Sequence, residues 1–243
     1  RRGFGGGRGG FNSGGGGGNF GGNNGITNAS SLGFNYRDDL NKKMTVFGSY
    51  SMRVRNTDAL SNSLRREADI QTTSNSNSQT DNTNHRFNFN LEYKIDTLNY
   101  LRISPSFSYS GSSSEGITNS ILRSSSITNQ NSNYNSTAKS PTFGGSVIYN
   151  HRFKKARRNL SVAASFYQSG NENEQDRRDV YEYPENADEN SVLKRLSNTN
   201  NESYNTDANV TYSEPLGKLS RIDIGYSYTL ASYDNSRLTY EGD

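Results

Sequence analysis

The sequence of 243 residues contains no cysteine and no tryptophan, only four prolines and only two histidines. The lack of cysteine excludes disulfide bonds and thiolate metal sites within these residues. His85 and His151 are too few for a histidine-based site, and they lie far apart in strand-like segments. No Ser-His-acid arrangement is therefore suggested, and we predict no enzyme and no cofactor. No apolar run approaches the ~20 residues of a transmembrane helix, and no signal peptide is visible.

Hydrophobic residues are also scarce, at 29% of the chain. A soluble domain of this length normally needs more, because buried apolar surface must offset the conformational entropy lost on folding. Such polarity alone would be typical of disorder. However, the chain has 16 tyrosines and 11 phenylalanines, and its apolar residues recur at regular spacing. A transmembrane β-barrel explains both facts, because only a thin outer band of such a barrel is apolar.

The segment 44–54 carries the clearest pattern. One face takes Met44, Val46, Gly48, Tyr50, Met52 and Val54, and the other takes Thr45, Ser49, Ser51 and Arg53, with Phe47 as the exception. A period of two indicates a β-strand. Its length matches the ~9–11 residues with which a tilted strand crosses a bilayer.

The same design recurs along the chain and predicts eight strands, at 28–37, 44–54, 86–95, 101–110, 142–153, 160–168, 204–213 and 221–230. Short turns alternate strictly with long polar segments, at about 56–84, 112–140 and 169–203. Outer-membrane barrels have short periplasmic turns and long extracellular loops. We therefore expect an all-β fold, a transmembrane antiparallel β-barrel over residues 26–243 in the outer membrane of a Gram-negative cell, with these three segments as extracellular loops. Residues 231–243 would begin another loop or extend the last strand.

This topology also predicts a fragment of a larger barrel. Both ends of the chain would be extracellular, whereas closed bacterial barrels normally have periplasmic termini. An open sheet of eight strands would leave backbone groups at its edges unpaired in lipid, at a cost of several kcal/mol each. We expect the remaining strands to come from a longer chain or from a second chain.

The alternation assigns side chains to two environments. The residues expected to face lipid are Val46, Tyr50, Phe87, Phe89, Leu91, Tyr93, Ile103, Phe107, Val147, Tyr149, Ile222, Ile224 and Tyr226. Outward tyrosines near the strand ends predict two aromatic girdles, with Tyr36, Tyr93, Tyr149 and Tyr212 near the short turns and Tyr50, Tyr109 and Tyr228 toward the long loops.

The charged residues expected to line the lumen are Arg53, Arg86, Glu92, Arg102, Arg152, Asp207, Arg221 and Asp223. They would either set the charge selectivity of transport or pair with one another or with a plug, and pairing is the favoured interpretation.

Residues 1–25 are dominated by glycine, with Arg1, Arg2 and Arg8 and three phenylalanines interspersed. One interpretation is an RGG-type nucleic-acid-binding arm. A flexible loop or linker is favoured, because the residues that follow do not resemble a nucleic-acid-binding domain. We therefore expect no nucleic-acid partner, and the net charge of +3 identifies no other partner.

Two charged clusters remain. The acids between Glu172 and Glu189 could bind Ca²⁺, but they lack the spacing of an EF-hand and are better interpreted as a solvated loop. The basic turn 154–158 could meet anionic lipid headgroups or be an ordinary charged turn.

The glycine-rich run that ends Gly21-Gly22-Asn23-Asn24-Gly25-Ile26-Thr27, followed by Leu32-Gly33-Phe34-Asn35-Tyr36, a short turn and Val46-Phe47-Gly48-Ser49-Tyr50, resembles the outer membrane β-barrel family of Bacteroidota. That family is similar to TonB-dependent receptors, and its members usually carry a plug before the barrel.

The resemblance implies an outer-membrane location and a role in substrate uptake or as a subunit of an outer-membrane complex. The implied partners are outer-membrane lipid, other outer-membrane or surface proteins, and TonB through a region that is not in this chain. Two alternatives remain open. The first is a non-transporting structural or interaction barrel whose loops bind partner proteins. The second, less favoured, is a soluble RGG-type nucleic-acid-binding protein.

Overall fold

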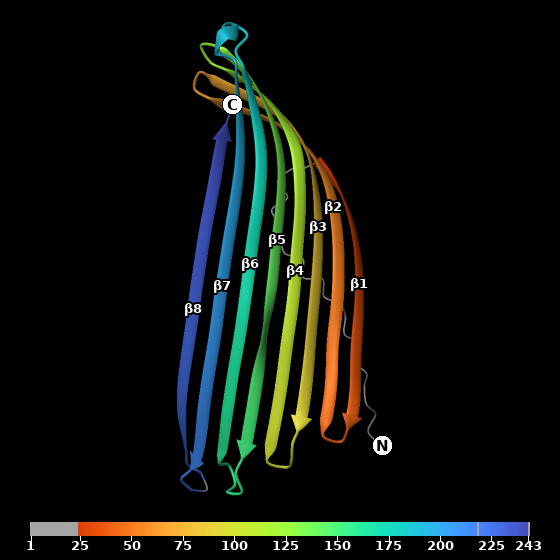
Figure 1. Cartoon of the computed structure of the whole chain (residues 1–243), viewed down its shortest axis with the longest axis vertical. Coiled ribbons are helices and arrows are strands. Elements are labelled where there is room, and N and C mark those ends of the chain that lie inside the picture. Colours follow the sequence, from red (N-terminus) through yellow and green to blue (C-terminus); the bar gives the residue numbers. More distant parts are fainter. Residues whose placement is uncertain (1–23, 218, 243) are drawn as a thin grey trace.

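The computed structural model describes residues 24–217 and 219–242, which form one antiparallel sheet of eight strands in sequential order. Figure 1 shows this sheet as a single curved layer with β1 and β8 at its edges. The strands are β1 (Asn24–Asn41), β2 (Met44–Glu67), β3 (Ile70–Lys94), β4 (Asn99–Arg123), β5 (Ile127–Arg152), β6 (Asn159–Glu182), β7 (Ser191–Pro215) and β8 (Arg221–Gly242).

A 3-10 turn, η1 (Ala187–Glu189), lies between β6 and β7. Within 24–217 and 219–242, no helix is long and apolar enough to cross a membrane. Residues 1–23 of the predicted glycine-rich segment lie outside the described residues. Its last two residues, Asn24 and Gly25, belong to β1.

The predictions of an all-β fold and of eight strands are confirmed, but the prediction of three long loops is wrong. Residues 56–84, 112–140 and 169–203 mostly continue the hairpins, which turn only at 68–69, 124–126 and 183–190. Residues 231–242 likewise extend β8. These segments are rich in Ser, Asn and Thr on both faces, so they lack the apolar alternation that marks a half-buried strand. Their backbone ladder nevertheless continues, because strand pairing does not require one apolar face.

The register staggers the strands along the sheet. The cross-strand row that begins at Met44, the first residue of β2, runs through Tyr93, Leu101 and Tyr149. It ends at Tyr226, which lies five residues inside the start of β8 at Arg221. A wall of tilted strands requires such a progressive shift, because closing a barrel demands both tilt and shear.

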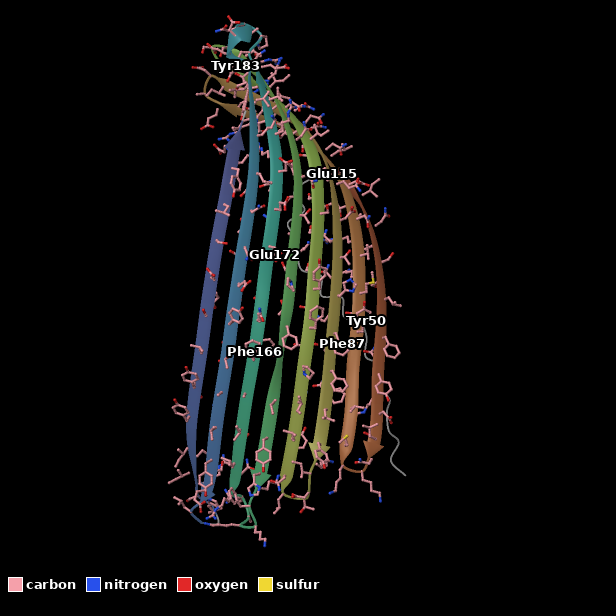
Figure 2. All side chains as sticks on the ribbon, viewed as in Figure 1. Tyr50, Phe87, Glu115, Phe166, Glu172 and Tyr183 are labelled. Atoms are coloured by element: carbon pink, nitrogen blue, oxygen red, sulfur yellow. The ribbon has the colours of Figure 1, made fainter. Side chains whose placement is uncertain are left out.

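This sheet has no dry interior. Val46 and Pro215 are the only buried apolar side chains in the described part of the chain. Figure 2 shows Tyr50, Phe87 and Phe166 in the half of the strands nearer the short turns, and Glu115, Glu172 and Tyr183 toward the opposite end. Exposed apolar side chains that lie together on one surface are typical of a site that contacts a membrane or another protein.

Two short turns at one end of the sheet are joined by an ionic cluster. Glu214 at the end of β7 accepts bonds from Lys155 Nζ (2.6 Å) and Arg158 Nε (2.7 Å) of the β5–β6 turn. Tyr212 donates its hydroxyl proton to the same carboxylate at 2.6 Å. The hydrogen bonds from Arg158, then those from Lys155 and Tyr212, hold the pKa of Glu214 well below its usual range. Two of the basic residues of this turn are therefore occupied within the protein.

We expect Glu214→Gln to lower the thermal unfolding midpoint of the full-length protein at neutral pH. Because the folded pKa lies below the ordinary glutamate value of about 4.3, this carboxylate stabilises the fold above that pH. The contribution is lost as the pH falls further, so the difference between wild type and variant should shrink below about pH 4. Circular dichroism melts across this range measure it. Glu185→Gln, in the exposed β6–β7 connection, is the control and should leave the midpoint unchanged; a constant difference at all pH values would contradict the assignment.

A second expectation concerns the neighbouring residues Ser146 and Val147 of β5, which point to opposite faces of the sheet. If the face of Val147 contacts lipid, Val147→Arg should lower the free energy of unfolding in vesicles by about 2–4 kcal/mol, the cost of Arg near the bilayer midplane. Ser146→Arg is the matched control and should have little effect. Equal losses in both variants, measured by denaturant unfolding, would show that the two faces have the same environment.

Candidate lumen-lining and lipid-facing surfaces

The strand register sorts side chains onto two faces, because directly paired residues in an antiparallel sheet project to the same side. Tyr50 pairs with Phe87, which pairs with Phe107, which pairs with Phe143. We call the side that carries this row the apolar face and the opposite side the polar face.

All thirteen residues predicted to meet lipid lie on the apolar face: Val46, Tyr50, Phe87, Phe89, Leu91, Tyr93, Ile103, Phe107, Val147, Tyr149, Ile222, Ile224 and Tyr226. Several of them are substantially open to the surroundings, as Tyr226 (68% exposed) illustrates. Contact with lipid itself stays a prediction, although the register brings the whole set together.

The height of the apolar face fits a bilayer. The alternating apolar residues begin at Phe87 of β3 and end at Ile95, directly after the last strand residue Lys94, and these nine residues span ~27 Å along the chain. The apolar band of an outer-membrane barrel is about 25 Å tall. Beyond this band the outer parts of the hairpins become polar, as expected for strands that have left the hydrocarbon.

The tyrosines lie at two levels along the strands. Tyr36, Tyr93, Tyr149 and Tyr212 lie within five residues of the strand ends at the short turns. Tyr50, Tyr109 and Tyr228 lie six to ten residues from the corresponding ends. The register pairs Tyr36 with Gly48, only two residues from Tyr50, so the two interfacial girdles stay a prediction.

All eight charged residues predicted to line a lumen lie on the polar face: Arg53, Arg86, Glu92, Arg102, Arg152, Asp207, Arg221 and Asp223. Their partners are mainly neutral groups. Arg102 donates to Asn90 (Nη2–Oδ1, 3.0 Å) and to a serine next to it on the same face. Asp207 accepts the Thr229 hydroxyl at 2.8 Å.

Only one ion pair joins members of this set among the described side chains, between Arg221 Nη2 and Asp223 Oδ2 at 2.8 Å. Glu92 and Arg102 are paired across β3 and β4, but Arg102 turns to neutral partners instead. Among the described side chains, the expected pairing of these charges with one another therefore applies to one pair, Arg221 with Asp223.

Phe47, the exception in the alternation of β2, has a local explanation. It lies on the polar face directly opposite Arg37 of β1. The Arg37 guanidinium carbon is 5.5 Å from the centre of the Phe47 ring, within the range of a cation–π interaction. The aromatic ring thus supports a charged side chain on the polar face and does not interrupt the strand.

The acidic segment 172–189 is divided by the pleat of β6. Glu172, Glu174 and Asp176 share one face, whereas Asp179 projects from the other. In the described part of the chain, no group of three or more potential ligands could hold a metal ion. Acids that are dense in the sequence are thus divided between the two faces of β6.

Asp179 was not recognised from the sequence as an important residue. It is only 3% exposed, and its carboxylate accepts a bond from Arg177 Nε at 2.9 Å and from Gln130 Nε2 at 3.4 Å. Burial raises the pKa of Asp179, but hydrogen bonds from Ser132, Arg177 and Gln130 outweigh it and leave the pKa below its usual value. A buried carboxylate with charged and neutral donors organises the side chains around it. Gln130 and Ser132 come from the neighbouring strand β5, so no local motif could reveal those partners, whereas Arg177 precedes Asp179 by two residues on β6 itself.

A comparison with family sequence patterns matches residues 151–243 to the outer membrane protein beta-barrel family. This segment covers the end of β5 and the strands β6, β7 and β8. A comparison with curated protein sequences finds no match.

Among solved structures, the toluene transporter TbuX of Ralstonia pickettii aligns with a TM-score of 0.30 and 9% identity, over 89% of this chain and 68% of that chain. The ferric-catecholate import receptor Fiu of E. coli K12 aligns with a TM-score of 0.31 and 8% identity, over 88% of this chain and 49% of that chain. The RagAB peptide importer aligns with a TM-score of 0.29 and 7% identity, over 88% of this chain and 37% of that chain. The chain thus spans about two thirds of TbuX and half of Fiu, and scores this low support no detailed comparison. The family match to residues 151–243, together with one antiparallel sheet that exposes an apolar face, places this chain in an outer-membrane β-barrel.

Proposed function

We propose that this chain forms part of the wall of an outer-membrane barrel that takes up a solute in the manner of a TonB-dependent receptor. The observation that carries the proposal is the separation of the two faces. One face presents exposed Phe, Tyr, Ile and Val, and the other presents Ser, Asn and Arg over the same height of the strands. A water-filled lumen requires this distribution, because lumen-facing and lipid-facing residues alternate along every strand. We assign the chain no chemical step of its own.

The two sheet edges support a role within a larger barrel. β1 pairs only with β2, and β8 pairs only with β7, among residues 24–217 and 219–242. In lipid each unpaired edge group costs several kcal/mol, so further strands must cover both edges. We assign the short turns to the periplasm and the outer hairpin ends to the cell exterior. On β5 the part outside the predicted membrane strand, residues 127–141, extends ~50 Å along the strand.

Because the chain contains no cysteine, single cysteines can report the environment of each face. We expect Ser106→Cys, on the polar face, to react with a membrane-impermeant maleimide in the full-length protein in vesicles. Phe107→Cys, on the apolar face, should react only with a lipid-soluble maleimide, because hydrocarbon excludes the charged reagent. Mass spectrometry after labelling measures both. Rapid reaction of both cysteines with the impermeant reagent would contradict a membrane-embedded wall.

Energy coupling separates the two candidate roles of the barrel. If the full-length protein is a TonB-dependent importer, uptake of its solute should require the protein and stop when TonB is deleted. Transport through a passive channel would continue in that strain, which would refute TonB dependence while leaving the barrel assignment intact.

A second candidate function is a non-transporting barrel that binds partner proteins at the cell surface. One observation favours it. On the apolar face, beyond the predicted membrane strands, Ile26 (70% exposed), Leu60 (56%) and Ile117 (49%) line a hollow of about 990 Å³. Exposed aliphatic side chains in an otherwise polar surface are typical of contact sites. A barrel of this kind would be retained on the surface with its partner and would show no solute uptake with or without TonB.

A further inference from the structure

A small hollow on the polar face lies outside the predicted membrane band, on β4, β5 and β6. Its volume is about 300 Å³, and its lining residues are Thr118, Ser120, Gln130, Ser132, Tyr134, Gln175 and Arg177. Tyr134 lies eight residues from Thr142, where the predicted membrane strand begins, so the hollow is ~26 Å beyond that point along β5. If the polar face lines the lumen, the hollow lies in the external entrance.

Tyr134 lies flat against the sheet because the neighbouring strand has a glycine opposite it. Gly116 and Tyr134 are directly paired across β4 and β5. A Cβ built at Gly116 would be 2.7 Å from Tyr134 Cε1 and 2.8 Å from Cζ and the hydroxyl oxygen. Any larger residue at 116 would therefore force the phenol ring away from the strand. The Tyr134 ring therefore lies against the backbone of Gly116, and Tyr134 is one of the residues that line the hollow.

The polar walls of the hollow are fixed by Asp179. Its carboxylate holds Arg177 (Nε–Oδ2, 2.9 Å) and Gln130 (Nε2–Oδ1, 3.4 Å), and Ser132 beside it is only 5% exposed. Two further hydroxyls are oriented by β3, since Thr118 donates to Ser76 at 3.0 Å and Ser120 shares a hydrogen bond with Ser74 at 2.8 Å. The side chains that face the hollow are thus held in place by neighbours, which limits the entropy that a ligand must remove on binding.

The charge of the hollow favours a neutral ligand. Its one cationic side chain, Arg177, is already paired with Asp179. A polyanion needs several cations that are free to contact its charges, which this hollow does not offer. An added peptide strand is also disfavoured, because β4, β5 and β6 already pair with one another here and leave no backbone edge. What remains is a flat aromatic ring flanked by hydroxyls and side-chain amides.

We propose that this hollow binds a neutral carbohydrate. The apolar C–H face of a sugar ring would stack on Tyr134, while its hydroxyl groups would exchange hydrogen bonds with Gln130, Gln175 and the hydroxyls of β4 and β5. A volume of about 300 Å³ accommodates a short stretch of an oligosaccharide and lies at the lower end of the range for ligand sites. The proposal names a substrate class for the proposed uptake role. It rests on that role in one respect, namely that the polar face lines the lumen.

The test is equilibrium binding of the purified full-length protein to an array of neutral hexose oligosaccharides, with acidic oligosaccharides and uncharged peptides on the same array. We expect at least one neutral oligosaccharide to bind. Tyr134→Ala should weaken that binding about tenfold by removing the aromatic face, whereas Tyr134→Phe should retain it. Gly116→Val should also weaken binding, because it displaces the ring without removing it.

Tyr233→Ala is the matched control, since Tyr233 is a tyrosine on the polar face of β8 that is 80% exposed and distant from β4 and β5. Thermal unfolding of each variant shows that it is folded. Binding by no neutral oligosaccharide, binding only of acidic sugars or peptides, or equal affinity in Tyr134→Ala and wild type would each overturn the proposal. Because binding is measured without transport, a failure here leaves the cysteine-labelling result, and with it the proposed uptake role, unaffected.

Discussion

Every backbone N–H and C=O group that crosses a bilayer core must find its partner in a neighbouring strand, because hydrocarbon offers none. The ladder from β1 to β8 meets this requirement with antiparallel neighbours, apart from short interruptions such as the one between β3 and β4 beside Pro105. The stagger from Met44 on β2 to Tyr226 on β8 follows from the same constraint, since tilted strands can stay fully paired only if their register shifts progressively. The chain can fold with few hydrophobic residues because backbone pairing between strands, and not a packed core, organises the sheet.

The ladder leaves each strand with two independent faces, and these faces are used for different purposes. Near the short turns one face is apolar and the other polar, which suits a wall between lipid and water. Farther along the hairpins both faces are largely polar, and local clusters replace the apolar band. Asp179 with its donors and Tyr134 over Gly116 are both in this outer part. A long paired hairpin can therefore carry a defined site where an irregular loop of the same composition would not hold one.

Much of the membrane half was predictable residue by residue. The two faces follow directly from alternation. The interruption of the β3–β4 ladder beside Pro105 agrees with the lack of a backbone N–H donor in proline. The outer halves of the hairpins could not be predicted. A segment such as 70–84 gives no periodic signal when water contacts both of its faces, although its backbone is paired on both sides. The low hydrophobicity of these segments therefore predicts loops where the structure has paired strands.

The sequence by itself determined that strands alternate between two environments, where the short turns fall, and which charged and apolar side chains share a face. These properties depend only on the period of two along each strand. The tertiary structure alone decided the length of the hairpins, the register between strands, and the contacts that register creates, such as Gly116 under Tyr134 and Gln130 beside Asp179. Such contacts join different strands, and a shift of one residue in pairing would place every one of these side chains on the other face.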